Sequence, residues 1–245
     1  MKRIFCLTVL IFVAFAKLSA QEEMGFDSKF AAGGGFTPGW IVPNFDAINE
    51  RLPSLGIEKL PSSGIFATGG TGFISIPFIK NLRIGGMGFG GSIKKTSVIN
   101  RISREVDYST SMGGFTAEYT MPFIKNIALS VGFIFGGGSN TIEVYENQVQ
   151  ENWDKFWGED FNIEMPQSGN SYKKLTNKHL MIAPTINIDI PIYRFFAFRI
   201  GGGYKFALSE SWEYNNEQTL NNIPSNLKSN LLFLQAGIFI GFFNY

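Results

Sequence analysis

His179 is the only histidine of the 245-residue chain and the side chain best suited to acid–base chemistry near neutral pH. Ser168 and Ser171 precede it in the same polar segment, and a histidine that activates a serine can hydrolyse or transfer an acyl group. No further residue pattern of such an enzyme accompanies them. We therefore predict that the protein is not an enzyme and that His179 is a polar residue at the outer interface, where a strand begins. A lipid-modifying enzyme with His179 at the rim is kept as an alternative.

Sites for a metal or a nucleotide are also not predicted. Cys6 is the only cysteine, and one histidine leaves only carboxylates as further metal ligands. Residues 86–91, GMGFGG, match the G-x-G-x-x-G pattern, but a dinucleotide site needs that pattern to open a helix. No helical periodicity follows, and the many other glycines fit curved or bulged strands. We expect no cofactor.

A nearly repeated hexamer organises the elements that position these residues. IPFIKN occupies residues 76–81, MPFIKN residues 121–126, and the looser IPIYRF residues 190–195. The residues on both sides of each copy alternate between bulky apolar and small or polar types, which is the period of a β-strand. Because a proline at a strand end gives up no ladder hydrogen bond, each hexamer fits a tight turn. The sequence therefore predicts three hairpins.

Two more strands, at residues 25–37 and 230–245, complete an expected set of eight. Short turns connect the strands at one end. Long loops are expected at the other end, at residues 38–64, 94–109, 139–178 and 209–229. This layout is typical of an all-β, eight-stranded antiparallel transmembrane β-barrel with short periplasmic turns and long extracellular loops.

The chain resembles the small outer-membrane β-barrels typified by OmpA and OmpX. The resemblance covers the mature chain by its layout, and its most specific part is an aromatic last strand. In that strand Phe239, Phe243 and Tyr245 occupy alternating positions. The resemblance implies that these three residues form the signal read by the barrel assembly machinery, and that outer-membrane lipid surrounds the chain.

The composition of the two strand faces predicts which face meets lipid. One face carries bulky residues such as Phe115, Leu129 and Ile186, whereas the other carries small ones such as Gly114 and Thr116. Small residues suit the narrow interior of an eight-stranded barrel, so the bulky face is expected to point outward. A soluble periplasmic lipid-binding barrel, with the faces reversed, is the alternative. In the last strand the same assignment places three apolar residues inward: Ile238, Ile240 and Phe242.

Seven charged residues fall on the predicted inner face: Asp27, Lys29, Arg83, Glu118, Asp189, Arg199 and Lys205. Counted from the turns, Arg83 and Asp189 lie near the short-turn end, and Glu118 and Arg199 lie near mid-height. Charges in a narrow bore must be paired or hydrated. We therefore predict a charge network that fills the bore, in which Glu118 contacts Arg199 directly or through one shared charge. A narrow conduit for small solutes is the alternative.

Four tryptophans are predicted to lie at the outer interface or to make contacts from the loops: Trp40, Trp153, Trp157 and Trp212. Trp153 and Trp157 are four residues apart, which favours a short helix with both rings on one side. Their loop, 139–178, also holds seven acidic residues, and it is the place expected for an extracellular protein or glycan partner. In the first loop, Asn44 is predicted to cap a short helix near residues 45–52 that ends at Pro53 and folds over the mouth.

The N-terminal residues predict export. Lys2 and Arg3 precede an apolar run at 4–16 and the small residues before position 21, so residues 1–20 are a predicted signal peptide. Residues 21–245 are then one outer-membrane barrel domain without cysteine. A net charge of +1 gives no electrostatic basis for binding nucleic acid. The expected function is that of an integral outer-membrane barrel with a structural or surface-interaction role.

Overall fold

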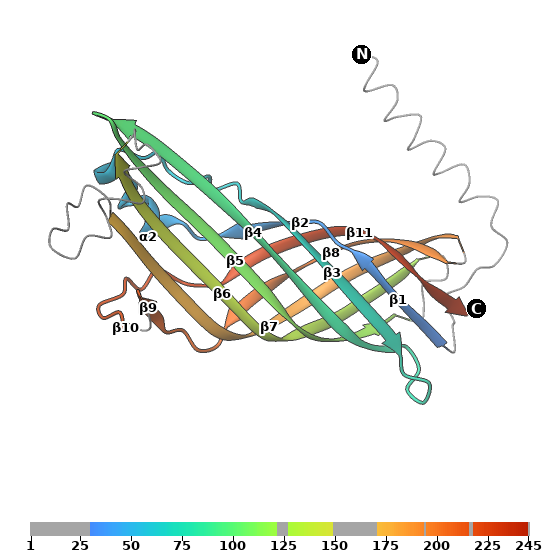
Figure 1. Cartoon of the computed structure of the whole chain (residues 1–245). Helices are drawn as coiled ribbons and strands as arrows, with labels where there is room; N and C mark the ends of the chain where they lie inside the picture. Colours follow the sequence, from blue (N-terminus) through green and yellow to red (C-terminus); the bar gives the residue numbers. More distant parts are fainter. Residues whose placement is uncertain (1–29, 122–126, 149–170, 194, 216–217, 245) are drawn as a thin grey trace, which may run out of the picture.

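The computed structural model describes residues 30–121, 127–148, 171–193, 195–215 and 218–244. Their strands form one antiparallel sheet that closes on itself (Figure 1). Because the sheet is closed, the backbone N–H and C=O groups of every strand in the ring can pair with a strand on each side. A sheet in lipid needs this pairing, because lipid offers no hydrogen bonds. Within these residues no helix has the length and apolar character needed to cross a membrane.

Eight positions make the ring, as predicted, and we call each position a stave. The first stave consists of two strands, β1 (Phe30–Phe36) and β2 (Gly39–Pro43). The other staves are β3 (Ile65–Ser75), β4 (Leu82–Ile99), β5 (Ile102–Thr120), β6 (Ala128–Gln148), β7 (Ser171–Tyr193), β8 (Phe196–Ala207) and β11 (Leu231–Asn244). Both β1 and β2 pair with β3 on one side and with β11 on the other, which closes the ring.

Pro38 divides the first stave into its two strands. Proline has no N–H group to donate, so a regular ladder cannot run through it. The flanking backbone groups are still paired: Thr37 N donates to Gly69 O at 2.9 Å, and Ala236 N donates to Pro38 O at 3.0 Å. The break is therefore local, and the barrel wall stays closed around it.

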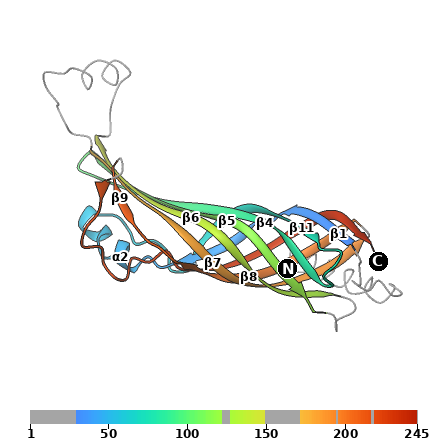
Figure 2. The same cartoon turned by 90° about the horizontal axis from the view of Figure 1, so that it is seen from below.

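Four neighbouring staves extend well beyond the rest of the barrel. The strands β4 to β7 have 18, 19, 21 and 23 residues, whereas β3 and β8 have 11 and 12. Their far ends form a projecting sheet, which we define as residues 92–111, 139–148 and 171–178 (Figures 1 and 2). The expected loop at 94–109 is therefore wrong. It is a hairpin that turns at Asn100 and Arg101, which both have positive φ.

The outward face of the ring is apolar, and the prediction for the three hairpins is correct. Phe115, Ile186 and Phe206 are all exposed on the outside. The prediction for the last strand is wrong, because Ile238, Ile240 and Phe242 point outward. Phe239 is only 1% exposed, whereas Ile240 is 62% exposed. The inward face does carry the polar Gln235 and the small Gly237 and Gly241, but its aromatic residues, Phe233 and Phe239, masked this signal.

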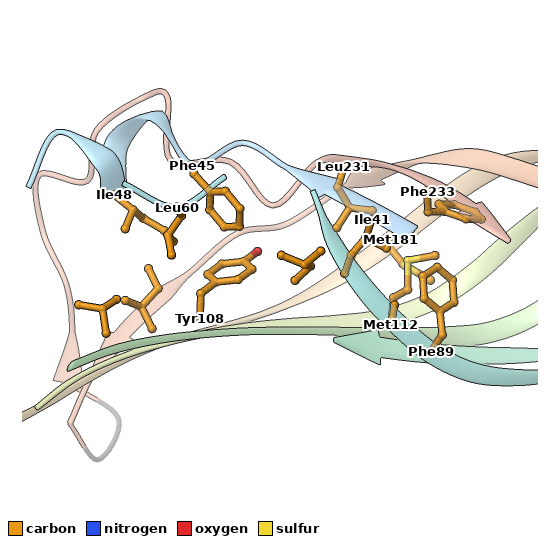
Figure 3. Packing of buried hydrophobic residues seen from close by; sticks show 14 of the residues in the cluster. Ile41, Phe45, Ile48, Leu60, Phe89, Tyr108, Met112, Met181, Leu231 and Phe233 are labelled. Atoms are coloured by element: carbon orange, nitrogen blue, oxygen red, sulfur yellow. The ribbon is translucent and has the colours of Figure 1, made fainter. Parts of the chain in front are cut away.

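An apolar core lies in the long-loop half of the bore (Figure 3). The first loop contributes to it through α2 (Asp46–Asn49) and the 3-10 helix η1 (Leu52–Leu55). The predicted cap is wrong, because the N-cap residue of α2 is Phe45 and no side chain caps the helix, whereas Asn44 Oδ1 accepts the Asp46 N–H at 2.8 Å just before it. Pro53 lies inside η1 rather than at a helix end. The ring of Phe45 packs edge-on against Tyr108 of the projecting sheet, with 4.8 Å between centroids.

The last long loop covers the same inner face. It contains β9 (Trp212–Tyr214) and β10 (Gln218–Thr219), and β9 pairs with β7. Partly buried apolar residues of this loop pack on the core: Leu220, Ile223 and Leu227. The projecting sheet is thus lined on its inner side by two folded loops, while its outer side continues the outer wall of the barrel.

Candidate functional site

Four of the predicted inward charges meet in one ionic layer, which we define as Arg83, Glu118, Asp189 and Arg199. They come from β4, β5, β7 and β8, and all four are buried. The sheet register places Arg83 opposite Glu118 and Asp189 opposite Arg199. Glu118 and Arg199 therefore lie level with Arg83 and Asp189 near the short-turn end, and the prediction that they lie at mid-height is wrong. Barrel strands are staggered, so the number of residues from a turn does not measure height.

Arg199 joins the two carboxylates of the ionic layer. Its Nη1 and Nη2 donate to Glu118 Oε1 and Oε2, each at 3.0 Å, which is a bidentate contact. Its Nε and Nη2 donate to Asp189 Oδ1 and Oδ2 at 2.5 and 2.9 Å. Arg83 Nη1 donates to Asp189 Oδ2 at 2.6 Å. Strands β5 and β8 are not ladder neighbours, so this contact spans the bore, as expected for Glu118 and Arg199.

Two amides extend the ionic layer toward the long-loop end. Asn187 Nδ2 donates to Glu118 Oε1 at 3.0 Å, and Gln235 Nε2 donates to Asn187 Oδ1 at 2.8 Å. The layer itself holds two guanidinium groups and two carboxylates, so it is neutral. Sequence reasoning missed both amides, although Asn187 lies two residues from Asp189 and so shares its inward face.

Two aromatic rings lie against the guanidinium groups of the ionic layer. Arg83 Cζ is 4.7 Å from the ring centroid of Phe73, and Arg199 Cζ is 4.6 Å from that of Phe239. Such contacts between a cation and a ring face are attractive, more so where water is excluded. Phe239 was predicted as part of an assembly signal. Its side chain points into the bore, where it packs against Arg199, and its role in assembly stays a prediction.

Lys205 and His179 also line the bore, but they lie apart from the ionic layer. Both residues are buried. The expectation that His179 sits at the outer interface is wrong, because its Nδ1 lies 2.8 Å from Asn177 Oδ1 inside the barrel. Lys205 is likewise inward, as predicted, yet it does not join the other charges. The two remaining predicted charges, Asp27 and Lys29, lie outside the described residues.

The predicted aromatic residues divide into three groups. Trp40 is exposed, and its Nε1 donates to Ser63 O at 2.5 Å. Trp212 is buried in the core, so its predicted place at the outer interface is wrong. The others lie where the structure describes no side chain: Trp153, Trp157, Phe243 and Tyr245.

The outer surface of the ring is apolar, and this property decides which kind of barrel it is. Large apolar side chains are exposed around the staves, among them Phe66, Phe133, Ile188, Ile200 and Leu234. The charged side chains of these stave segments point into the bore instead. This is the fold of a small outer-membrane β-barrel. Because the apolar side chains face outward, the alternative of a soluble lipid-binding barrel is wrong.

Solved barrels of known outer-membrane proteins are similar to this barrel. A major outer-membrane protein of Thermus thermophilus is 8% identical, with 87% of this chain and 99% of that one covered and a TM-score of 0.49. Neisserial surface protein A is 8% identical, with 87% and 97% covered and a TM-score of 0.38. Ail of Yersinia pestis, in complex with the heparin analogue sucrose octasulfate, is 7% identical, with 87% and 97% covered and a TM-score of 0.39. No family model and no curated protein matches the chain.

The outer face of the projecting sheet is polar and carries a row of charges. Lys94, Asp107, Glu143 and Lys174 lie side by side across its four strands. The hydroxyls of Tyr172 and Tyr145 donate to the two Glu143 oxygens at 2.9 and 3.0 Å. Lys174 Nζ is 3.3 Å from Glu143 Oε1. Glu143 is therefore the centre of a hydrogen-bonded group above the apolar band of the barrel.

This group should make the projecting sheet sensitive to acid. Burial alone would raise the pKa of Glu143, but its hydrogen bonds to Tyr172, Tyr145 and Lys174 outweigh burial and lower that pKa. A lowered folded-state pKa stabilises the sheet above the ordinary value of 4.5, and this stability is lost as the pH falls below that value. We expect the protection factors of amide hydrogen exchange in the projecting sheet to fall in that window.

The double variant Tyr145→Phe, Tyr172→Phe is the control for the acid response. It removes the two hydroxyl donors and keeps the two rings in contact, with their centroids 4.9 Å apart. In this variant the Glu143 pKa, followed by NMR, should rise toward its ordinary value. An unchanged pKa would contradict the assignment of these hydroxyls as the cause.

Proposed function

We propose that the protein is a non-enzymatic outer-membrane barrel whose bore is closed and whose role is structural or lies in interaction at the cell surface. The observation that carries the proposal is the contact of Arg199 with Glu118 across the bore, which Arg199 makes together with its contact to Asp189 on the neighbouring strand. The neutral layer leaves its buried charges paired, and the apolar core occupies the bore above it. A barrel of eight staves has an interior that side chains can fill.

The projecting sheet supports the surface role. Along β7 it runs from Lys178 to Ser171, which is roughly 25 Å at the usual rise per residue of a strand. Its inner face is held by the two loops, and its outer face offers Ser, Thr, Tyr and charged side chains. A polar sheet that projects beyond the barrel would be accessible to a partner outside the cell. The expected partner segment at 139–178 contributes two of its strands.

The surroundings of His179 support a non-enzymatic role. Among the described residues its only hydrogen-bonding neighbour is Asn177, and no serine hydroxyl pairs with its ring. A general base must come within hydrogen-bond reach of the group that it activates. A histidine buried in the bore is also remote from a lipid at the rim of the barrel.

Surface labelling tests the proposed orientation. The mature chain is predicted to lack cysteine, so one introduced thiol reports on one position. In intact cells we expect a membrane-impermeant maleimide to label Thr141→Cys, on the outer face of the projecting sheet. The control Lys80→Cys lies on the β3–β4 turn at the opposite end and should react only after lysis. Labelling of Lys80→Cys alone would overturn the proposal.

A further inference from the structure

A groove opens on the outer wall of the barrel at the long-loop end. It has a volume of about 310 Å³, and it lies where β2 ends, where β8 nears its end and where β11 begins. We define this rim groove by six of the residues that line it: Val42, Asn44, Asp46, Tyr204, Asn230 and Leu232. Its volume is at the lower end of the range of small-molecule sites, which is about 300–1,000 Å³.

The lower half of the rim groove belongs to the apolar wall of the barrel. The sheet register places Val42, Leu232 and Tyr204 in one row across β2, β11 and β8. Leu232 and Tyr204 are exposed on the outer face, as is Trp40, which lies two residues before Val42. Tryptophan and tyrosine are enriched where the hydrocarbon of a membrane meets its headgroups. The row therefore marks the headgroup level at the long-loop end of the barrel.

The upper half of the rim groove is polar. Asn44 comes directly after β2, and Asn230 comes directly before β11, so both continue the outward faces of their strands toward the long loops. Asn44 Oδ1 accepts the Asp46 N–H at 2.8 Å. Asn230 Oδ1 accepts the Ala207 N–H, also at 2.8 Å. These two bonds fix the amide groups by their oxygens and leave both Nδ2 groups as donors for a ligand.

The charge of the rim groove limits the kind of headgroup that suits it. Among the described residues that line the groove, Asp46 is the only charged one, and it is exposed. A carboxylate accepts hydrogen bonds but repels a phosphate group. A sugar hydroxyl both donates and accepts, so it can pair with Asp46 and with an amide Nδ2. The ring of Tyr204 adds a flat apolar surface with a polar hydroxyl at its tip.

We propose that the rim groove binds the uncharged sugar headgroup of one membrane lipid, whose acyl chains lie along the apolar wall below it. A second hollow of about 650 Å³ shares Asp46 with the groove and is lined by loop residues such as Lys59 and Asn226. This hollow gives a larger headgroup room to extend away from the hydrocarbon. The inference rests on the proposed orientation of the barrel only for the choice of the outer leaflet.

Native mass spectrometry of the barrel released from lipid nanodiscs tests this site, and it does not depend on the orientation in cells. The nanodiscs contain phosphatidylcholine and a small fraction of a monoglucosyl diacylglycerol with the same acyl chains. We expect one glycolipid to stay bound to the wild type in preference to phosphatidylcholine. A parallel sample contains phosphatidylethanolamine in place of the glycolipid. Its ammonium group can pair with Asp46, so this sample separates charge pairing from sugar recognition.

Two variants act on the two halves of the rim groove. Asp46→Ala removes the charged acceptor and should lower glycolipid retention about tenfold. Leu232→Trp fills the apolar half and should lower retention to a similar extent. Both residues are exposed, so the barrel should still fold. Leu234→Trp is the matched control for the second variant, because Leu234 is exposed on the same face of β11 but does not line the groove. Asp107→Ala, on the projecting sheet, is the control for the first, and both controls should retain the glycolipid like the wild type.

Three results would overturn the inference. The first is a wild-type barrel that retains the glycolipid no better than phosphatidylcholine. The second is equal or stronger retention of phosphatidylethanolamine, which would make the groove a site for an ammonium group rather than for a sugar. The third is unchanged glycolipid retention in Leu232→Trp, which would place the bound lipid elsewhere on the barrel wall.

Discussion

Glu118→Gln is expected to lower the free energy of unfolding by about 3–5 kcal/mol, because it leaves an unbalanced positive charge in a buried site. Arg199 would keep only the Asp189 carboxylate, which it already shares with Arg83. Arg199→Gln should cost a similar amount for the opposite reason, since two carboxylates would then share one guanidinium. The measurement is a urea titration of the barrel folded into lipid vesicles.

The double variant Glu118→Gln, Arg199→Gln is the critical comparison. It leaves Arg83 and Asp189 as a balanced pair, so much of the loss should be recovered. Glu58→Gln is the control, because it breaks the exposed contact with Lys95 and should cost about 0–1 kcal/mol. Additive effects of the two single changes would show that the ionic layer is hydrated and its charges independent.

Ile186→Arg is expected to cost about 2–4 kcal/mol, because it places a charge in hydrocarbon near the middle of the bilayer. Ile186 lies on the outward face of β7, between the exposed Ile182 and Ile188. The loss should appear as a lower free energy of unfolding from lipid vesicles.

Thr176→Arg is the matched control for this lipid-face variant. Thr176 lies on the same strand and also faces outward. It belongs to the projecting sheet, however, where the surroundings are water rather than lipid. Its change to arginine should therefore have little effect on stability. If both arginines cost the same, the outer face would carry no boundary between lipid and water, and the assignment of the apolar band would fail.

The alternation of side chains was sufficient to predict most of the barrel. Phe115 and Thr116, or Ile186 and Asn187, differ so clearly in size and polarity that the face of each strand could be assigned. The hexamer turns fixed the order of the hairpins. The alternation also identified the residues of the ionic layer, because Arg83, Glu118, Asp189 and Arg199 lie at alternating positions with the outward-facing apolar residues.

Other features needed three-dimensional information. In β11 large apolar side chains occupy both faces, so the burial of Gln235 and Phe239 was needed to show that their face turns inward. The projecting sheet is polar on its outer face and is covered by loops on its inner face. Its polar residues, such as Lys94 and Lys95, therefore resemble those of a loop in the sequence. Trp212 is buried because its segment folds back onto β7, a long-range contact that no local pattern predicts.

Single-channel recording in planar bilayers tests the closed bore most directly. We expect no steady ionic current from the refolded wild-type barrel, because the paired charges of the ionic layer and the apolar core above it leave no continuous path for hydrated ions. A steady current whose size or ion selectivity changes in Arg199→Gln would contradict this, and the barrel would be a narrow conduit.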